Sequence, residues 1–82
     1  MSHFISNTYE LLKEPAGRLI LECLQSVESY GRSWRLDKGS VYGNRLSTLF
    51  SASKPDGQGR DRLMVVAVET PTCDWTVSYQ LF

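Results

Sequence analysis

Residues that support catalysis or metal binding are scarce in this 82-residue chain. It contains a single histidine, His3, and two cysteines, Cys23 and Cys73, which stand far apart in the sequence. Zinc sites need closely spaced cysteines and histidines, and a Ser-His or Cys-His nucleophile pair would have to recruit His3 itself. We therefore predict a protein that is not an enzyme and that holds no metal and no cofactor. In a reducing compartment both cysteines are expected to be free thiols, although a disulfide between them stays open.

Long apolar runs are missing as well. No stretch approaches the ~18 apolar residues that a membrane span needs, and residues 1–6 lack the basic and apolar blocks of a signal peptide. We therefore expect a cytoplasmic protein with no membrane partner. The length allows one domain, residues 1–82, in which residues 1–6 are expected to be frayed. The hydrophobic fraction of 41% is ordinary for globular proteins, so we expect a folded core.

Net charge is also absent, but the charges are unevenly distributed along the chain. Residues 32–62 hold seven basic and three acidic residues, whereas residues 1–31 hold two and four, and residues 63–82 hold two acidic ones alone. Neutralisation of phosphates by lysine and arginine supplies much of the affinity for nucleic acids. The basic middle segment therefore indicates a nucleic-acid surface, and a solvated surface of scattered charges is the alternative.

The clearest structural pattern is an amphipathic helix over residues 15–30. Its apolar residues recur at steps of three and four, and its opposite face is polar. A shorter helix is expected before it, over residues 8–13, with Asn7 as the N-cap and Glu10 completing a capping box. The two helices supply one apolar face that has to pack against the rest of the chain.

The middle of the chain is ambiguous between helix and strand. After a short strand pattern at residues 32–37, apolar side chains at i, i+4, i+7 and i+8 favour a helix over residues 40–52; they are Tyr42, Leu46, Leu49 and Phe50. The alternative strand places Leu46, Thr48 and Phe50 on one face. It leaves Leu49 on the opposite face, so the helix is favoured and the strand stays open.

The C-terminal part predicts a β-hairpin. Residues 63–68 form a valine-rich apolar run, and residues 75–81 alternate strictly between apolar and polar side chains. Five residues, 70–74, form the connection between them. The expected fold class is therefore α+β, a small single domain with two or three helices plus a C-terminal antiparallel β-hairpin.

Three segments resemble parts of the small winged helix-turn-helix domains of phage and mobile-element regulators. RLILECLQ at residues 18–25 is similar to the first helix, NRLSTL at residues 44–49 to the recognition helix, and VSYQL at residues 77–81 to the final wing strand. Residues 32–39 are too few for the further helix that such domains carry. The resemblance implies a winged-helix-like fold and a small, non-catalytic, DNA-binding regulatory protein. A homodimer of this chain is expected with that role.

This hypothesis names two groups of site residues. Residues expected to read bases in duplex DNA are Asn44, Arg45 and Thr48, and those expected to hold phosphates are Lys54, Arg60 and Arg62.

Two other functions stay open. The first is a small phage or mobile-element protein that binds a host protein and inhibits or modulates it, because aromatic residues and arginine dominate protein-binding hot spots. Its candidate contact residues are Tyr30, Trp34, Arg35 and Tyr42. The second is an RNA-directed, toxin-like enzyme, which RNA cleavage by the pure protein would reveal.

Overall fold

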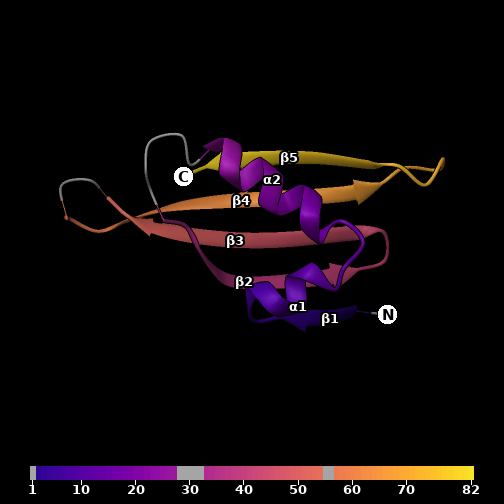
Figure 1. The fold of residues 1–82 in the computed structure, drawn as a ribbon, viewed down its shortest axis with the longest axis horizontal. Coiled ribbons are helices and arrows are strands. Elements are labelled where there is room, and N and C mark those ends of the chain that lie inside the picture. The colour runs from indigo at the N-terminus through magenta and orange to yellow at the C-terminus, as the bar shows by residue number, and fades with distance from the viewer. Residues whose placement is uncertain (1, 28–32, 55–56) are drawn as a thin grey trace.

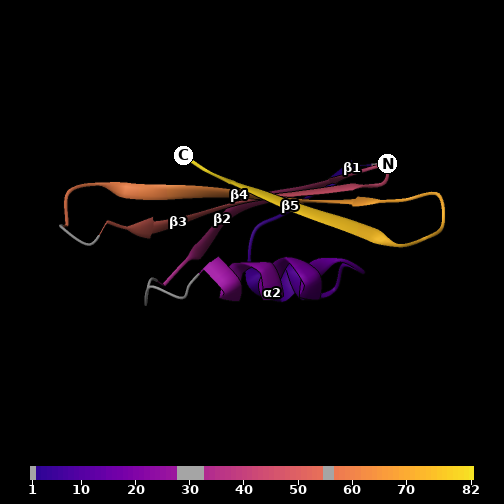
Figure 2. The same cartoon turned by 90° about the horizontal axis from the view of Figure 1, so that it is seen from above.

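The described residues of the protein form a five-stranded antiparallel sheet with two helices on one of its faces (Figures 1 and 2). This computed structural model describes residues 2–27, 33–54 and 57–82. The elements in chain order are β1 (Ser2–Ile5), α1 (Thr8–Leu12), α2 (Gly17–Val27), β2 (Arg35–Tyr42), β3 (Arg45–Ser53), β4 (Arg60–Glu69) and β5 (Trp75–Leu81). The strand order in the sheet equals the order in the chain, so β1 and β5 form the two edges.

The predicted winged-helix-like fold is wrong, chiefly because residues 40–52 do not form a helix. They form the end of β2, a tight turn and most of β3. Gly43 begins that turn with a φ of 61°, which two-residue hairpin turns require and which glycine adopts without strain. Leu46 and Phe50 face the helices and Leu49 faces away from them. Because Leu46 and Phe50 on one face of the strand and Leu49 on the other are all apolar, their spacing matched that of a helix.

The elements at the two ends of the chain fit the sequence patterns better. α1 lies within the predicted range 8–13, and α2 begins at Gly17 within the predicted range 15–30, of which residues 28–30 lie outside the described residues. Residues 63–68 and 75–81 pair antiparallel within β4 and β5. These two strands belong to a larger sheet, however, and are no separate wing. Residues 2–5, which were expected to be frayed, form β1 along the edge of β2, where Ile5 pairs with Gly39 and is buried.

The start of α1 follows the capping prediction closely. The Asn7 side chain accepts a hydrogen bond from the backbone N–H of Glu10 at 2.9 Å. The Glu10 carboxylate accepts bonds from the hydroxyl (2.5 Å) and the backbone N–H (3.0 Å) of Ser6. These bonds favour the charged carboxylate, so they lower the pKa of Glu10 below its ordinary value. Asn7 is therefore the N-cap, and Ser6 receives the reciprocal contact.

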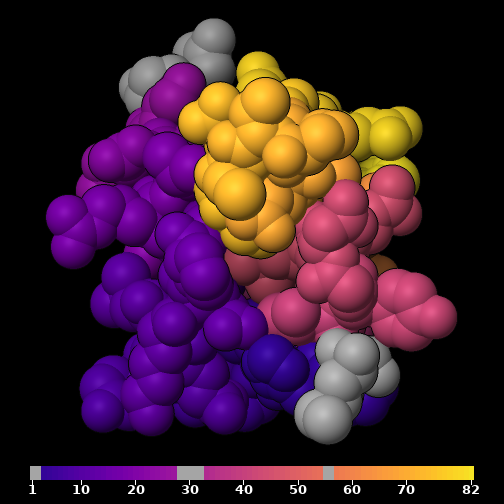
Figure 3. Space-filling model, turned by 90° about the vertical axis from the view of Figure 1, so that its right-hand side faces the viewer, coloured from indigo at the N-terminus to yellow at the C-terminus, as the bar shows by residue number. Residues whose placement is uncertain are grey.

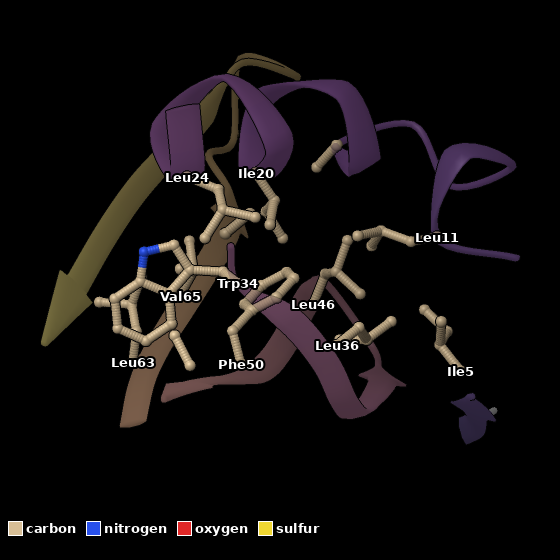
Figure 4. Packing of buried hydrophobic residues seen from close by; sticks show 13 residues of the cluster. Ile5, Leu11, Ile20, Leu24, Trp34, Leu36, Leu46, Phe50, Leu63 and Val65 are labelled. Carbon is tan, nitrogen blue, oxygen red and sulfur yellow. The ribbon is translucent and has the colours of Figure 1, made fainter. Parts of the chain in front are cut away.

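The core lies between the helices and the face of the sheet that they cover (Figure 4). Its large buried side chains are Ile5, Leu11, Ile20, Leu24, Trp34, Leu36, Leu46, Phe50, Leu63 and Val65. Every element except β5 contributes a buried hydrophobic residue to this layer, whereas the residues of β5 are half-buried or exposed. In the described ranges neither helix is long and apolar enough to cross a membrane.

Candidate functional site

The face of the sheet opposite the helices carries the candidate site, and we call it the open face. Successive side chains of a strand point to opposite faces, so the neighbours of the core residues Leu46 and Phe50 point away from the helices. Figure 2 shows both helices on one side of the sheet and no described element on the other. Unlike most sheet faces turned to solvent, this one is not uniformly polar.

The strand register aligns the side chains of the open face in rows that run across the sheet, and three neighbouring rows cover its middle. The central row consists of Lys38, Leu49, Met64 and Gln80. The row on one side consists of Phe4, Ser40, Ser47, Val66 and Ser78. The row on the other side consists of Arg35, Ser51, Arg62 and Phe82, in which the Phe82 N–H donates to the Arg62 carbonyl at 2.9 Å. Residues far apart in the sequence thus share one surface.

A hollow of about 660 Å³ lies over these rows. Leu49 and Met64 form part of its lining and are half-buried. Phe4 from β1 and Phe82 after β5 also line it, so the hollow extends from one edge strand toward the other. Two charged residues, Lys38 and Arg62, also line the hollow. The lining is therefore largely apolar and carries two positive charges.

Charge is segregated between the two sides of the molecule. Among the described residues, the open face carries five cations, namely Arg35, Lys38, Arg45, Arg60 and Arg62. Asp37, in a β-bulge of β2, is the one carboxylate there, which gives a net charge of +4. The remaining described residues include three lysines or arginines and six carboxylates, a net charge of −3. A chain of zero net charge thus presents one positive face.

Asp37 neutralises only one corner of that face. Its carboxylate accepts a hydrogen bond of 3.0 Å from the hydroxyl of Ser51, which in turn accepts one of 3.0 Å from Arg60 Nη2. The nitrogen Nε of Arg35 lies 4.0 Å from the same carboxylate. In the described part of the chain, no carboxylate forms an ion pair with Lys38, Arg45 or Arg62. These three cations are available to an external anion.

Three aromatic rings on the open face are exposed to solvent. The exposed fractions are 85% for Phe4, 74% for Tyr42 and 64% for Phe82. Large apolar side chains usually avoid such exposure, and a patch of them together with arginines commonly marks a binding surface. The open face thus combines positive charge with flat apolar rings.

The structure brings together only part of the residues proposed from the sequence. Arg45, Arg60 and Arg62 from the DNA-binding set lie on the open face, and so do Arg35 and Tyr42 from the protein-binding set. Asn44 lies in the β2–β3 turn, where its side chain donates to the Glu69 carbonyl at 3.1 Å (Figure 3 shows this end of the molecule). Lys54 follows β3, with Nζ 4.0 Å from Asp61.

Two proposed contact residues lie in the interior. Thr48 is among the residues that line the hollow, but it is buried, and its hydroxyl already donates a hydrogen bond of 2.8 Å to the Val65 carbonyl. Trp34 is buried in the core. Tyr30 lies outside the described residues.

Sequence reasoning missed eight residues that line the hollow, namely Phe4, Lys38, Gly39, Ser40, Ser47, Leu49, Met64 and Phe82. The one signal that could have found part of this set is Leu49, which breaks the alternation of a strand whose other face is apolar. Phe4 and Phe82 reach the site through strand pairing over long sequence distances, which leaves no local pattern.

Within the described ranges, no three histidine, cysteine or acidic residues are grouped so that they could hold a metal ion. Both cysteines are free thiols, and partial burial raises the pKa of Cys23. Comparison with protein-family models, curated proteins and solved structures finds no match to this chain.

Proposed function

We propose that the open face binds single-stranded nucleic acid. The observation that carries this proposal is the segregation of charge, with a net +4 on the open face of a chain that is neutral as a whole. Such segregation favours a polyanion as the ligand, because phosphates held near Lys38, Arg45 and Arg62 release their counterions. A homodimer of this chain through the same face would instead set like charges against each other.

The exposed aromatic rings suit a single strand. Unpaired bases stack on aromatic side chains of sheet surfaces, and each stacked base contributes about 1–3 kcal/mol. Phe4, Tyr42 and Phe82 are exposed on the same face as the cations. The hollow has a largely apolar lining for a base, and Lys38 and Arg62, which also line it, supply positive charge for phosphates.

A duplex is a poorer fit to this surface. Five strands spaced about 4.8 Å apart make a sheet about 19 Å wide, whereas the major groove of B-DNA is about 12 Å wide. The segment proposed as a recognition helix, residues 44–49, lies instead in the β2–β3 turn and in β3 of that sheet. We therefore replace the proposal of duplex DNA with one of single-stranded DNA or RNA. The proposed compartment stays the cytoplasm, because free thiols persist there.

A titration of fluorescent oligonucleotides tests the proposal. We expect a 12-nucleotide single strand to bind more tightly than a duplex of the same sequence. With about four phosphates neutralised, affinity for the single strand should fall about 30-fold or more between 50 and 200 mM salt. Equal affinity for both forms, or no binding of the single strand at 50 mM salt, would contradict the proposal.

The second candidate is a host protein with an acidic surface, which the same face could bind. It is favoured by the enrichment of this face in arginine, methionine and aromatic residues, the composition of protein interfaces. Arg35 and Tyr42 keep their proposed role in this case. A stoichiometric complex with an acidic protein, together with no affinity for oligonucleotides, would favour this candidate.

A further inference from the structure

The outer edge of β5 carries a row of backbone groups directed away from the sheet. The Phe82 N–H donates to the Arg62 carbonyl, so these two residues form a hydrogen-bonded pair of the antiparallel ladder. Such pairs alternate along a ladder, and residues 76, 78 and 80 therefore also bond to β4. The N–H and C=O groups of the other four residues point outward from the edge; they are Trp75, Val77, Tyr79 and Leu81.

This edge lacks the devices that keep sheet edges from pairing. Natural proteins protect an exposed edge with lysines, prolines, bulges or a very short strand. Residues 75–82 contain no charged residue and no proline. β5 pairs with β4 without a bulge over seven residues, whereas β1 at the opposite edge has only four. In Figure 2 the edge of β5 faces the viewer, and no described element passes over it.

The side chains along this edge are also incompletely covered. Trp75, Val77, Tyr79 and Leu81 point toward the helix side of the sheet, and α2 packs over part of the strand. Tyr79 and Leu81 remain 55% and 53% exposed. An additional strand beside β5 would cover them and pair the outward backbone groups.

We propose that β5 pairs antiparallel with β5 of a second copy of this chain, about a two-fold axis at Ser78. This register places Val77 opposite Tyr79 of the second copy, and Trp75 opposite Leu81. Each of the four residues whose backbone groups point outward then pairs with such a residue of the second copy. This pairing gives about eight backbone hydrogen bonds. The pairs on the open face are Thr76 with Gln80 and Ser78 with itself, so the small serine lies on the axis.

A second copy fits this edge because the segment is complementary to itself. Antiparallel pairing of residues 75–82 sets no like charges opposite each other, whereas like charges in such pairs are destabilising. Pairs of aromatic or β-branched side chains, such as Val77 with Tyr79, are favourable across strands. A register centred two residues earlier would place Pro71, which has no N–H, opposite Leu81. The register centred at Ser78 is therefore preferred.

The dimer would be one continuous ten-stranded sheet. The axis runs perpendicular to the sheet, so both open faces lie on the same side and meet at β5. The interface does not include the cations of the open face and does not depend on the proposed function. Loss of the dimer and loss of oligonucleotide binding can therefore be observed separately.

Replacement of Val77 by proline tests the interface. Because the Val77 N–H points outward, Val77→Pro removes a donor of the edge and leaves the hydrogen bonds to β4 in place. We expect the wild-type protein to sediment as a dimer of the 9.3-kDa chain, and the variant as a monomer with an unchanged far-UV circular dichroism spectrum. Val77→Thr, a β-branched control, should remain dimeric.

A second variant covers the case in which proline prevents folding. Tyr79→Lys adds a charge to the edge without changing the backbone, and we expect it to be monomeric as well. A wild-type monomer at 100 µM protein, or a dimer that persists in folded Val77→Pro and Tyr79→Lys, would overturn the proposal.

Cysteine cross-linking tests the register. In a background with Cys23→Ala and Cys73→Ser, Ser78→Cys places two thiols in a non-hydrogen-bonded pair, whose Cα atoms lie about 4.5 Å apart, within the range for a disulfide. Oxidation should give a covalent dimer. Thr76→Cys, which would face Gln80 instead, should cross-link far more slowly. Equal rates for the two variants would overturn the register centred at Ser78.

Discussion

Replacement of Lys38 and Arg62 together by glutamate should weaken binding of a single-stranded oligonucleotide by about 100-fold at 50 mM salt. Both residues line the hollow of the open face, and no described carboxylate pairs with either. Each substitution removes an attraction to phosphate and adds a repulsion of similar size, about 1 kcal/mol at a separation of 4 Å in water. Two such reversals amount to roughly 3–4 kcal/mol, and 100-fold corresponds to about 2.8 kcal/mol. Fluorescence anisotropy with the 12-nucleotide strand would measure the loss.

The matched control changes the same charges on the helix side. Lys13→Glu and Arg18→Glu together also replace one lysine and one arginine with acids, and both residues are exposed. We expect this variant to lose less than about three-fold in affinity, because charges more than a Debye length away are screened. An equal loss in the two variants would show that net charge alone determines binding, and would contradict a site on the open face.

Replacement of Phe50 by alanine should destabilise the fold by about 3–5 kcal/mol. Phe50 is 1% exposed and lies in β3 between Leu36 of β2 and Leu63 of β4, in the middle of the core. A domain of this size has a total stability of only about 4–12 kcal/mol, so much of it would be lost. Urea denaturation followed by tryptophan fluorescence would measure the change.

Leu49→Ala is the informative control for that prediction. Leu49 is the neighbour of Phe50 in the chain but points to the open face, where it is half-buried. We expect a loss of about 1 kcal/mol, because fewer contacts surround a partly exposed side chain. On a helix over residues 40–52 both side chains would face the core, and the two variants would then destabilise the protein to a similar extent.

The sequence predicted those elements whose pattern comes from a single covered face. α2 has one apolar stripe and β5 alternates strictly, so both were found from periodicity. β3 has apolar residues on both faces, because Leu49 lies on the open face and Phe50 in the core. Local spacing cannot separate these two causes, and the strand was therefore interpreted as a helix.

The candidate site was predictable only in its charge. The basic segment of residues 32–62 indicated an anion-binding surface, but which cations share a face depends on strand register. The β-bulge between Leu36 and Lys38 decides this for Lys38, since without the extra residue it would point toward the core. Phe4 and Phe82 join the site through pairing of β1 and β5 at the ends of the chain.

Methyl chemical shifts would test most directly the claim that the open face binds single-stranded nucleic acid. Leu49 and Met64 carry methyl groups at the hollow, whereas Leu12 and Leu19 carry exposed methyl groups on the helices. Titration of methyl-labelled protein with the 12-nucleotide strand should shift the resonances of Leu49 and Met64 and leave those of Leu12 and Leu19 in place. Shifts confined to Leu12 and Leu19, or no shifts at saturating oligonucleotide, would contradict the claim.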